Sequence, residues 1–519
     1  MINSFVTSKI RDNFGFPPTS EQSEAIDMLG EFLMSRRDSA LFLLRGYAGT
    51  GKTTLVGALV KTLVGLNQPV VLMAPTGRAA KVFSSYAGQP AYTIHKRIYR
   101  QKSITDTESF SLNVNLSKHT LFIVDEASMI ANDGLSSSVF GTGRLLDDLI
   151  QYVYSGEGCR LLLMGDTAQL PPVGEEESPA LMPSLLASYG LHVYEKTLTQ
   201  VMRQLSESGI LYNATAIRYC LTALQHGIEV DNNLQASIFD SQFSDVAHVS
   251  GGDLIDSLET SYSRWGADDC MIICRSNKRA NIYNQGIRNR ILYREDELTS
   301  GDRIMIVKNN YYWVEQEQRA LLAESVGSHR PAPEMLRVAH YGTIGNGNNS
   351  EFKNQNSSLP LSFIANGDIA IVRRVRRTRE VYGFRFADVL LRFPDYDDYE
   401  METTVLLDTL QSESPSLTRE ESERLFQSVM EDYNHLTTKK ERYQHLRLDP
   451  HFNALQIKYA YAVTCHKAQG GQWGCIYLDQ GYLPPDLSPI DYHRWLYTAF
   501  TRATEQVYLV NWPTSSTSI

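Results

Sequence analysis

The sequence predicts an α/β protein built on parallel β-sheets, and three observations lead to this fold class. Short apolar runs alternate with helix-like stretches in the first 200 residues. Each run ends in small or acidic residues, as buried strands of a parallel sheet do. A glycine-rich loop at residues 46–53 stands between one such run and a helical stretch. Alternation of this kind gives a sheet whose functional loops lie at the carboxyl ends of its strands.

The first sheet is predicted from four apolar runs. They are ALFLLRG at 40–46, PVVLMAP at 69–75, TLFIVDE at 120–126 and RLLLMGD at 160–166. The stretch TTLVGALVKTLVGL, which follows the first run, has the composition of a helix. Residues 97–119 are polar and alternating, which predicts a small β-ribbon inserted into this domain. We therefore expect a first α/β domain over residues 1–200.

A second alternation of strands and helices begins at about residue 200. Its clearest strand is CMIIC at 270–274, and the alternation returns near the carboxyl end, in CIYLDQ and WLYTAFTRATEQVYLVNW. A long stretch of different character separates these two parts. We therefore expect a second α/β domain over 201–310 and 453–519, with a β-rich domain inserted at 311–452.

The inserted stretch contains three recognisable segments. Residues 345–358 form a polar, low-complexity loop that we expect to be flexible. The run GDIAIVRRVRRTREVYGFRF has the composition of paired strands with a turn. A helix is predicted to start at Thr418, whose hydroxyl would form a capping box with Glu421. The same pattern places Leu425, Val429 and Leu436 on one face of that helix.

Composition excludes several classes of protein. The chain has 519 residues, with 49 Lys and Arg against 59 Asp and Glu, a formal net charge of −10. That balance argues against a protein that coats nucleic acid nonspecifically. The apolar runs fall short of the roughly 18–20 residues that a membrane span needs. The first residues lack the pattern of a secretory signal, and six scattered cysteines favour reduced thiols, so we expect a cytoplasmic protein.

The glycine-rich loop Gly46-Tyr-Ala-Gly-Thr-Gly-Lys-Thr53 matches the phosphate-loop pattern GxxxxGK[ST]. Its glycines let backbone N–H groups turn towards a polyphosphate, and the following helix adds a partial positive charge at its N-terminus. Lys52 is expected to reach the β- and γ-phosphates, and Thr53 to coordinate Mg²⁺. The predicted ATP-binding residues of the loop are Gly46, Ala48, Gly49, Thr50, Gly51, Lys52, Thr53 and Thr54.

An acidic pair, Asp125 and Glu126, closes the third apolar run. A carboxylate at this position can hold Mg²⁺, and we assign that role to Asp125 together with Thr53. The adjacent Glu126 can polarise the attacking water. With the phosphate loop upstream, the pair predicts a nucleotide hydrolase rather than a nucleotide-binding protein without turnover.

Further blocks follow in a fixed order. They are PTGRAAK at 75–81, TIHK at 93–96, GDTAQLPPV at 165–173, LTQVMRQ around Arg203, TCHKAQG at 464–470 and YTAFTRA at 497–503. Taken together, these blocks closely resemble superfamily 1 helicases, and within them the RecD/Dda-like branch (superfamily 1B). The resemblance covers nearly the whole chain outside the insert. It implies two RecA-like domains, ATP in the cleft between them, and single-stranded DNA across their top.

The resemblance also implies roles at the nucleotide. Gln22 looks like the glutamine that reads adenine, although it also suits the polar start of a helix. Gln169 resembles the γ-phosphate sensor. Arg203 and Arg502 resemble the arginines that the second domain presents to the γ-phosphate, so with Lys52 and Glu126 they complete the predicted catalytic set.

Six residues match family positions that contact the DNA backbone: Thr76, Arg78, Thr93, His95, Thr464 and His466. Hydroxyls and imidazoles can hydrogen-bond phosphates without reading bases. The ribbon at 97–119 lies where the family carries a strand-separating pin. Its aromatic residues, Tyr99 and Phe110, either stack on a base at the fork or pack the ribbon against its host domain.

The insert departs from the family pattern. The family has a small SH3-like barrel here, formed from segments like GDRIMIVKNNY and NGDIAIV, which in this sequence stand far apart. Its outline and its DNA contacts are therefore open. Five arginines form the sharpest basic cluster of the chain, namely Arg373, Arg374, Arg376, Arg377 and Arg379. They either line the DNA path or form a solvated strand edge near the acidic segment 395–400.

The leading prediction is a motor driven by ATP and Mg²⁺ that moves 5′→3′ on single-stranded DNA and separates forked duplexes. The resemblance implies a bacterial or phage-type protein that acts as a monomer, with protein partners in replication, repair or recombination. The alternatives are a helicase directed to RNA, and a RecD-like motor subunit of a larger complex. A scaffold with a dead nucleotide site would lack Lys52, Asp125, Glu126, Gln169 or Arg502, and all five are present.

Overall fold

The computed structural model describes residues 2–103, 106–132, 141–201, 208–228, 243–325, 361 and 363–512. The predicted polar loop at 345–358 and the predicted catalytic Arg203 lie outside these ranges. The chain divides into two compact units. The first unit comprises Met1–Ala280 and Val463–Ile519, and the second comprises Asn281–Ala462.

The first unit contains a six-stranded sheet in the order β3-β2-β6-β7-β1-β8, and neighbouring strands pair in parallel. The strands are β1 (Ala40–Gly46), β2 (Val70–Ala74), β3 (Ala91–Thr93), β6 (Leu121–Val124), β7 (Arg160–Gly165) and β8 (His192–Leu198). Each of the four predicted apolar runs forms a strand of this sheet. Because all strands run the same way, their carboxyl ends meet at one edge, and this confirms the predicted α/β fold class.

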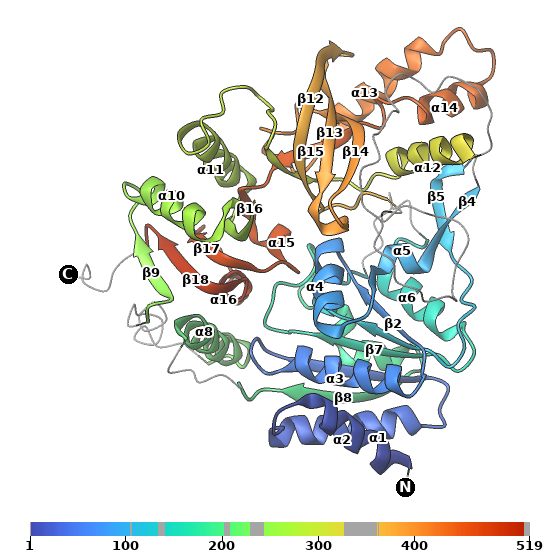
Figure 1. Cartoon of the computed structure of the whole chain (residues 1–519), viewed down its shortest axis with the longest axis vertical. Helices are drawn as coiled ribbons and strands as arrows, with labels where there is room; N and C mark the ends of the chain where they lie inside the picture. The colour runs from blue at the N-terminus through green and yellow to red at the C-terminus, as the bar shows by residue number, and fades with distance from the viewer. Residues whose placement is uncertain are drawn as a thin grey trace. The chain divides into compact units, whose positions relative to one another are not determined.

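Helices pack against this sheet (Figure 1). They are α1 (Ile2–Phe14), α2 (Ser20–Met34), α3 (Lys52–Gly65), α4 (Gly77–Ala87), α5 (Ile94–Ile98), α6 (Leu145–Tyr154) and α7 (Pro183–Ser188). The core between α1, α2, α3 and β1 contains Ile10, Leu29, Phe32, Phe42 and Leu59, all fully buried. Burial of such side chains contributes roughly 1.5–3 kcal/mol each, so this core fixes the helix that follows the glycine-rich loop.

The predicted ribbon is present in the first unit. It consists of β4 (Tyr99–Ser103) and β5 (Asp106–Leu112), which pair antiparallel with Tyr99 opposite Leu112. The ribbon begins directly after α5 and lies within the predicted range 97–119.

A second sheet has the order β16-β10-β17-β18-β9, and its last four strands pair in parallel. Its strands are β9 (Val246–Val249), β10 (Cys270–Cys274), β16 (Ala462–Thr464), β17 (Trp473–Asp479) and β18 (Ala503–Val510). The accompanying helices are α8 (Gly209–Gln225), α10 (Leu254–Trp265), α15 (Cys465–Ala468) and α16 (Pro489–Phe500), while α11 (Asn277–Arg290) begins in the first unit and continues into the second. Strands β10 and β17 are buried throughout, which explains why their sequences are apolar without alternation.

The second unit is built on a closed five-stranded barrel (Figure 1). Its strands are β11 (Arg303–Ile306), β12 (Ile369–Val381), β13 (Phe384–Phe393), β14 (Tyr399–Leu406) and β15 (Leu455–Tyr459), with α12 (Tyr312–Ser325), α13 (Arg419–Asp432) and α14 (Lys439–Arg447) beside it. Tyr382 and Gly383 join β12 to β13 with φ values of 58° and 70°. Two successive left-handed residues form the tight turn that suits the twist of a hairpin. The β-rich insertion therefore belongs to a barrel, as the family resemblance implied, but the barrel is larger than the predicted range 311–452, because β11 and β15 lie outside it.

Short 3₁₀ helices complete the described structure: η1 (Ala127–Met129), η2 (Pro179–Leu181), η3 (Ala267–Asp269) and η4 (Pro394–Tyr396).

The helix predicted from Thr418 forms, with one correction. Thr418 caps α13, and Glu421 completes the capping box. Leu425 and Val429 are buried in a cluster with Phe384 and Phe386 of the barrel. Leu436 was predicted on the same face, but α13 ends at Asp432. The Tyr433 N–H turns back to the carbonyl of Met430, which tightens the last turn and leaves Leu436 in the turn beyond.

The arginines of β12 divide into two groups. Arg373 pairs with Glu400 at 3.1 Å, Arg376 with Glu402 at 2.9 Å, and Arg379 with Asp388 at 2.9 Å. Arg374 and Arg377 are exposed. Three of the five cationic side chains are thus neutralised by carboxylates on β13 and β14 of the same barrel, which favours the solvated-edge interpretation for these three.

Candidate active site

The glycine-rich loop joins β1 to α3 at the carboxyl edge of the first sheet. Gly49 and Gly51 adopt φ values of 76° and 81°. This left-handed conformation is costly for other residues, so the glycine positions of the motif have a steric reason. Gly51 is the N-cap of α3 and has no side chain to satisfy the first N–H groups of the helix. These N–H groups therefore remain available to a polyphosphate.

Two side chains bind the loop from within the first domain. The Lys52 ammonium group donates to the carbonyl of Gly46 at 2.5 Å and to that of Tyr47 at 2.9 Å. The Gln22 amide donates to the Thr50 carbonyl at 3.0 Å, and Gln22 is 1% exposed. Gln22 also belongs to the capping box that Thr19 forms at the start of α2. Gln22 therefore caps a helix and lies against the phosphate loop, and its reading of adenine stays a prediction.

Three carboxylates converge beside the loop. Asp125 and Glu126 follow β6, and Asp166 follows β7, the strand between β6 and β1. Burial, and next the charge of Glu126, raise the pKa of Asp125 to about 6. Burial also raises the pKa of Asp166, and the charge of Lys52 opposes this rise for both aspartates. A cation bound here would relieve the repulsion among these carboxylates.

Glu126 has an unusual backbone conformation. Its φ is 51° and ψ is 39°, in the left-handed region, and its N–H donates to Asp125 Oδ1 at 2.7 Å. A glutamate in this region carries strain of about 1–3 kcal/mol, which is typical of functional positions. The turn directs Glu126 towards Arg502, whose Nη1 lies 3.7 Å from Glu126 Oε1.

Arg502 comes from the second sheet domain and is 4% exposed. Its guanidinium group donates to the carbonyls of Thr498 at 3.1 Å and Gly471 at 3.3 Å. The predicted arginine finger and the predicted water-polarising carboxylate are therefore brought together, although 376 residues separate them in the sequence (502 − 126).

Four hydrogen bonds also join the two sheet domains at this place. The Tyr497 hydroxyl donates to Asp166 Oδ2 at 2.6 Å and accepts from the Ala48 N–H at 2.8 Å. The Leu170 N–H donates to the Thr498 hydroxyl, and the Gln469 amide donates to the Leu170 carbonyl at 2.7 Å. The sequence placed Tyr497 and Asp166 inside recognised blocks but gave neither a role. The position of both residues inside these blocks was the only sequence feature that marked them as functional candidates.

Gln169 lies beside these contacts. It is 7% exposed, and its Oε1 atom makes no hydrogen bond. It lines a cavity of about 270 Å³ together with Arg45, Thr167 and Arg494. A buried amide oxygen without a donor is costly, so it suits a residue that contacts a ligand.

The residues suit a nucleotide with Mg²⁺. The Thr53 hydroxyl and the carboxylates supply the hard oxygen ligands that Mg²⁺ prefers. In the part of the chain that the structure describes, no group of three or more His, Cys, Asp or Glu side chains forms a metal cage. Mg²⁺ is usually held by one or two carboxylates together with the phosphates of the nucleotide, so this arrangement fits.

The predicted DNA-contacting residues lie at the ends of strands. Thr76 caps α4 through the Ala79 N–H at 3.2 Å, Thr93 caps α5 through the Lys96 N–H at 3.2 Å, and Thr464 precedes α15. The Arg78 guanidinium donates to the Gln472 carbonyl at 2.8 Å and stacks 4.1 Å from the Trp473 ring. The hydroxyls thus have structural roles in addition to any contact with DNA.

The two predicted histidines are neutral at pH 7. Burial lowers the pKa of His95 to about 4 and also lowers the pKa of His466. They would therefore meet phosphates as neutral hydrogen-bonding groups.

The two ribbon aromatics differ in surroundings. Tyr99 is 7% exposed, and its hydroxyl donates to Asp148 Oδ2 at 2.7 Å. Asp148 belongs to α6 of the host domain, so Tyr99 packs the ribbon against that domain. Phe110, on β5, is half-buried. Of the two roles open for the ribbon, base stacking therefore fits Phe110 better than Tyr99.

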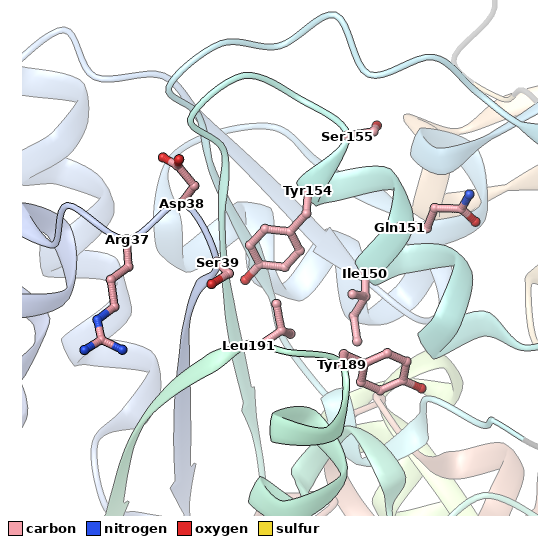
Figure 2. A pocket seen from close by; sticks show the side chains of 9 residues that line it. All are labelled: Arg37, Asp38, Ser39, Ile150, Gln151, Tyr154, Ser155, Tyr189 and Leu191. Carbon is pink, nitrogen blue, oxygen red and sulfur yellow. The ribbon is translucent and has the colours of Figure 1, made fainter.

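A second, larger groove lies at the opposite edge of the sheet. It has a volume of about 830 Å³ and is lined by residues that include Arg37, Ser39, Tyr154 and Leu191 (Figure 2). These residues lie at the amino ends of β1 and β8 and at the end of α6. None of the predicted site residues lines this groove.

Two protein-family models match parts of this chain. Residues 19–227 match the AAA domain family, and residues 459–510 match the UvrD-like helicase C-terminal domain family.

No helix of the described residues is long and apolar enough to cross a membrane.

Two named relatives align with the chain over part of their length. The ATP-dependent RecD2 DNA helicase of Deinococcus radiodurans is 30% identical over 38% of this chain and 23% of that protein. The ATP-dependent DNA helicase dda of Enterobacteria phage T4 is 29% identical over 34% of this chain and 37% of that protein. A crystal structure of Bacteroides Pif1 bound to ssDNA is 15% identical, covering 95% of this chain and 92% of that chain, with a TM-score of 0.45.

Proposed function

Because this chain is a superfamily 1 helicase of the RecD/Dda-like branch, we propose that it hydrolyses ATP to move along single-stranded DNA and to separate duplexes. The observation that carries this proposal is the meeting of Arg502 with Glu126 beside the phosphate loop. The arginine comes from the domain that does not hold the loop. When hydrolysis needs groups from both domains, turnover of ATP is coupled to movement of one domain relative to the other.

The roles of the residues follow from their chemistry. Backbone N–H groups of the loop and the Lys52 ammonium group bind the phosphates. Mg²⁺, held by Thr53 and Asp125, would supply positive charge against the β- and γ-phosphate oxygens. Glu126 accepts a proton from the attacking water, and Arg502 stabilises the charge that spreads over the γ-phosphate oxygens. An arginine in this role contributes about 10³–10⁵ in rate in well-studied phosphoryl-transfer enzymes.

Lys52→Ala tests the nucleotide half of the proposal. The variant is expected to lose DNA-stimulated ATP hydrolysis, because the developing charge on the phosphates loses its nearest cation. Lys61→Ala, on the same helix but outside the loop, is the matched control and should hydrolyse ATP at the wild-type rate. Near-normal turnover by Lys52→Ala would exclude the motor.

Unwinding of tailed duplexes tests the DNA half. We propose 5′→3′ movement, so a duplex with a 5′ single-stranded DNA tail should be unwound and one with a 3′ tail should not. Preference for the 3′ tail would overturn the direction, and preference for an RNA tail would replace DNA by RNA as the substrate.

A further inference from the structure

Tyr86 lies near the end of α4 and contacts the predicted metal ligands from outside the phosphate loop. Its ring stacks on Phe83 with 5.1 Å between centroids, and Phe83 is fully buried. A Cβ atom added at Gly57 of α3 would lie 3.4 Å from the Tyr86 carbonyl oxygen, so the two helices approach closely here. The ring is therefore held by packing, which fixes the place of its hydroxyl.

The hydroxyl of Tyr86 joins two predicted metal ligands. It donates to Asp125 Oδ2 at 2.5 Å, and the Thr53 side chain hydrogen-bonds to the same hydroxyl. Thr53 belongs to α3 and Asp125 follows β6, and the Tyr86 hydroxyl contacts both.

The other end of α4 carries predicted DNA contacts. Thr76 is its N-cap, and Arg78 lies in its first turn. The same end packs against the second sheet domain, because a Cβ atom at Gly470 would lie 3.1 Å from both Ala79 and Thr76. A helix of 11 residues is a rigid rod about 16 Å long. A displacement of the first end by DNA would therefore be carried to Tyr86 at the other end.

We propose that Tyr86 is a positioning residue, which orients Thr53 and Asp125 for Mg²⁺ and links this orientation to DNA through α4. The inference rests on the proposed function. A threonine hydroxyl that coordinates a cation must direct its proton elsewhere, and a tyrosine oxygen offers an acceptor. Residues that orient metal ligands in this way typically change metal affinity about 10–100-fold when they are altered.

Tyr86→Phe tests the proposal because it keeps the ring and removes only the hydroxyl. The measurement is the affinity for a fluorescent ADP analogue, first with EDTA and then with Mg²⁺, each without and with an oligo(dT) strand. In EDTA the variant should bind the analogue as tightly as the wild-type protein does. The factor by which Mg²⁺ increases its affinity should be about tenfold smaller than in the wild-type protein. Addition of oligo(dT) should change that gain in the wild-type protein and leave it unchanged in the variant.

Tyr154→Phe is the matched control. Its hydroxyl donates to the Ala40 carbonyl at 2.9 Å, in the same domain but at the opposite edge of the sheet (Figure 2). It removes one hydrogen bond of similar kind, so it should retain the full gain from Mg²⁺. The proposal would be overturned if Mg²⁺ increased the affinity of Tyr86→Phe by a factor within about twofold of the wild-type factor. An equal loss of affinity with and without Mg²⁺ would also overturn it.

A double-mutant cycle separates positioning from loss of structure. If Tyr86 acts through Asp125, adding Tyr86→Phe to Asp125→Asn should cause little further loss of the gain from Mg²⁺. Fully additive losses would contradict the proposal even if Tyr86→Phe is less stable. A wild-type protein that binds no nucleotide would instead refute the proposed function.

Discussion

At the scale of single residues, burial makes the charge of the Lys467 side chain sensitive to pH. It lies in the block TCHKAQG, next to the predicted DNA contact His466. Burial lowers the pKa of its ammonium group from 10.5 to about 8. Lys467 is therefore mostly charged at pH 7 and mostly neutral at pH 9, unlike an ordinary lysine.

We predict that single-stranded DNA binds more weakly at pH 9 than at pH 7. A raised pH removes the proton, so the charge is present below the pKa and lost above it. One exposed charge pair contributes up to about 1 kcal/mol, so the loss should be no more than about fivefold. Fluorescence anisotropy with oligo(dT) measures it. Lys467→Arg keeps its charge and should bind equally at both values, and a pH effect that persists in this variant would assign the loss to another group.

Tyr497 is the residue that joins the phosphate loop, Asp166 and the helix leading to Arg502. Tyr497→Phe leaves the Ala48 N–H without its acceptor and Asp166 Oδ2 without the hydroxyl donor, and a buried group left unpaired costs about 1–3 kcal/mol. We expect kcat for ATP hydrolysis to fall about tenfold, with a smaller change in KM, because the contact positions the two domains rather than the nucleotide. Tyr492→Phe, on the same helix with its hydroxyl on Gln480, is the control and should hydrolyse ATP normally. An equal fall in both variants would show a general loss of stability.

At the scale of elements, the strands were predictable and several contacts between them were not. The apolar runs ending at Gly46, Asp125 and Asp166 gave strands because a buried strand of a parallel sheet needs no alternation. The cap of α13 followed from Thr418 and Glu421, since a capping box is local. The end of α13 was misjudged at Leu436, because hydrophobic periodicity alone does not show where a last turn closes.

Tyr86 was missed for a different reason. It lies 39 residues before Asp125, and no local pattern marks it. Its position depends on how α4 packs against α3, which only the three-dimensional fold determines. The phosphate loop could be located because its function needs glycines at fixed spacing, whereas a supporting hydroxyl can come from any element that packs nearby.

The second unit contains a buried ion cluster that links α11 to the start of β11. Asp302 is fully buried and accepts from Arg288 Nε and Nη2 at 3.0 Å each, from Arg294 at 2.9 Å, and from the Thr299 N–H at 2.8 Å. Asp302→Asn would leave two arginines without their counter-charge. Breaking such a pair costs about 3–5 kcal/mol, so the unfolding transition of this unit should move to lower denaturant.

Chemical denaturation of the full chain measures this effect. Asp398→Asn is the control, because Asp398 forms an exposed ion pair with Arg392 and such pairs contribute about 0–1 kcal/mol. Equal shifts in the two variants would mean that the buried cluster contributes no more than a surface pair.

At the scale of the whole molecule, the net charge of −10 still excludes a protein that coats nucleic acid. It does not exclude DNA binding, because a motor needs only one local path along the phosphates and must release it in each cycle. The cations next to the predicted DNA contacts are few, namely Arg78, Lys96 and Lys467. His95 and His466 add no charge at pH 7, because burial lowers the pKa of both.

The salt dependence of DNA binding should therefore be shallow. Single strands give a slope of about −0.7 per phosphate neutralised, so three cations predict a slope of log K against log[salt] near −2. Anisotropy with oligo(dT) over a series of KCl concentrations measures it. The double variant Arg374→Ser/Arg377→Ser should keep this slope, because we expect the solvated-edge interpretation of their three paired neighbours to extend to these two exposed arginines. A wild-type slope near −3.5 that falls to about −2 in the double variant would instead place these two arginines on the DNA path.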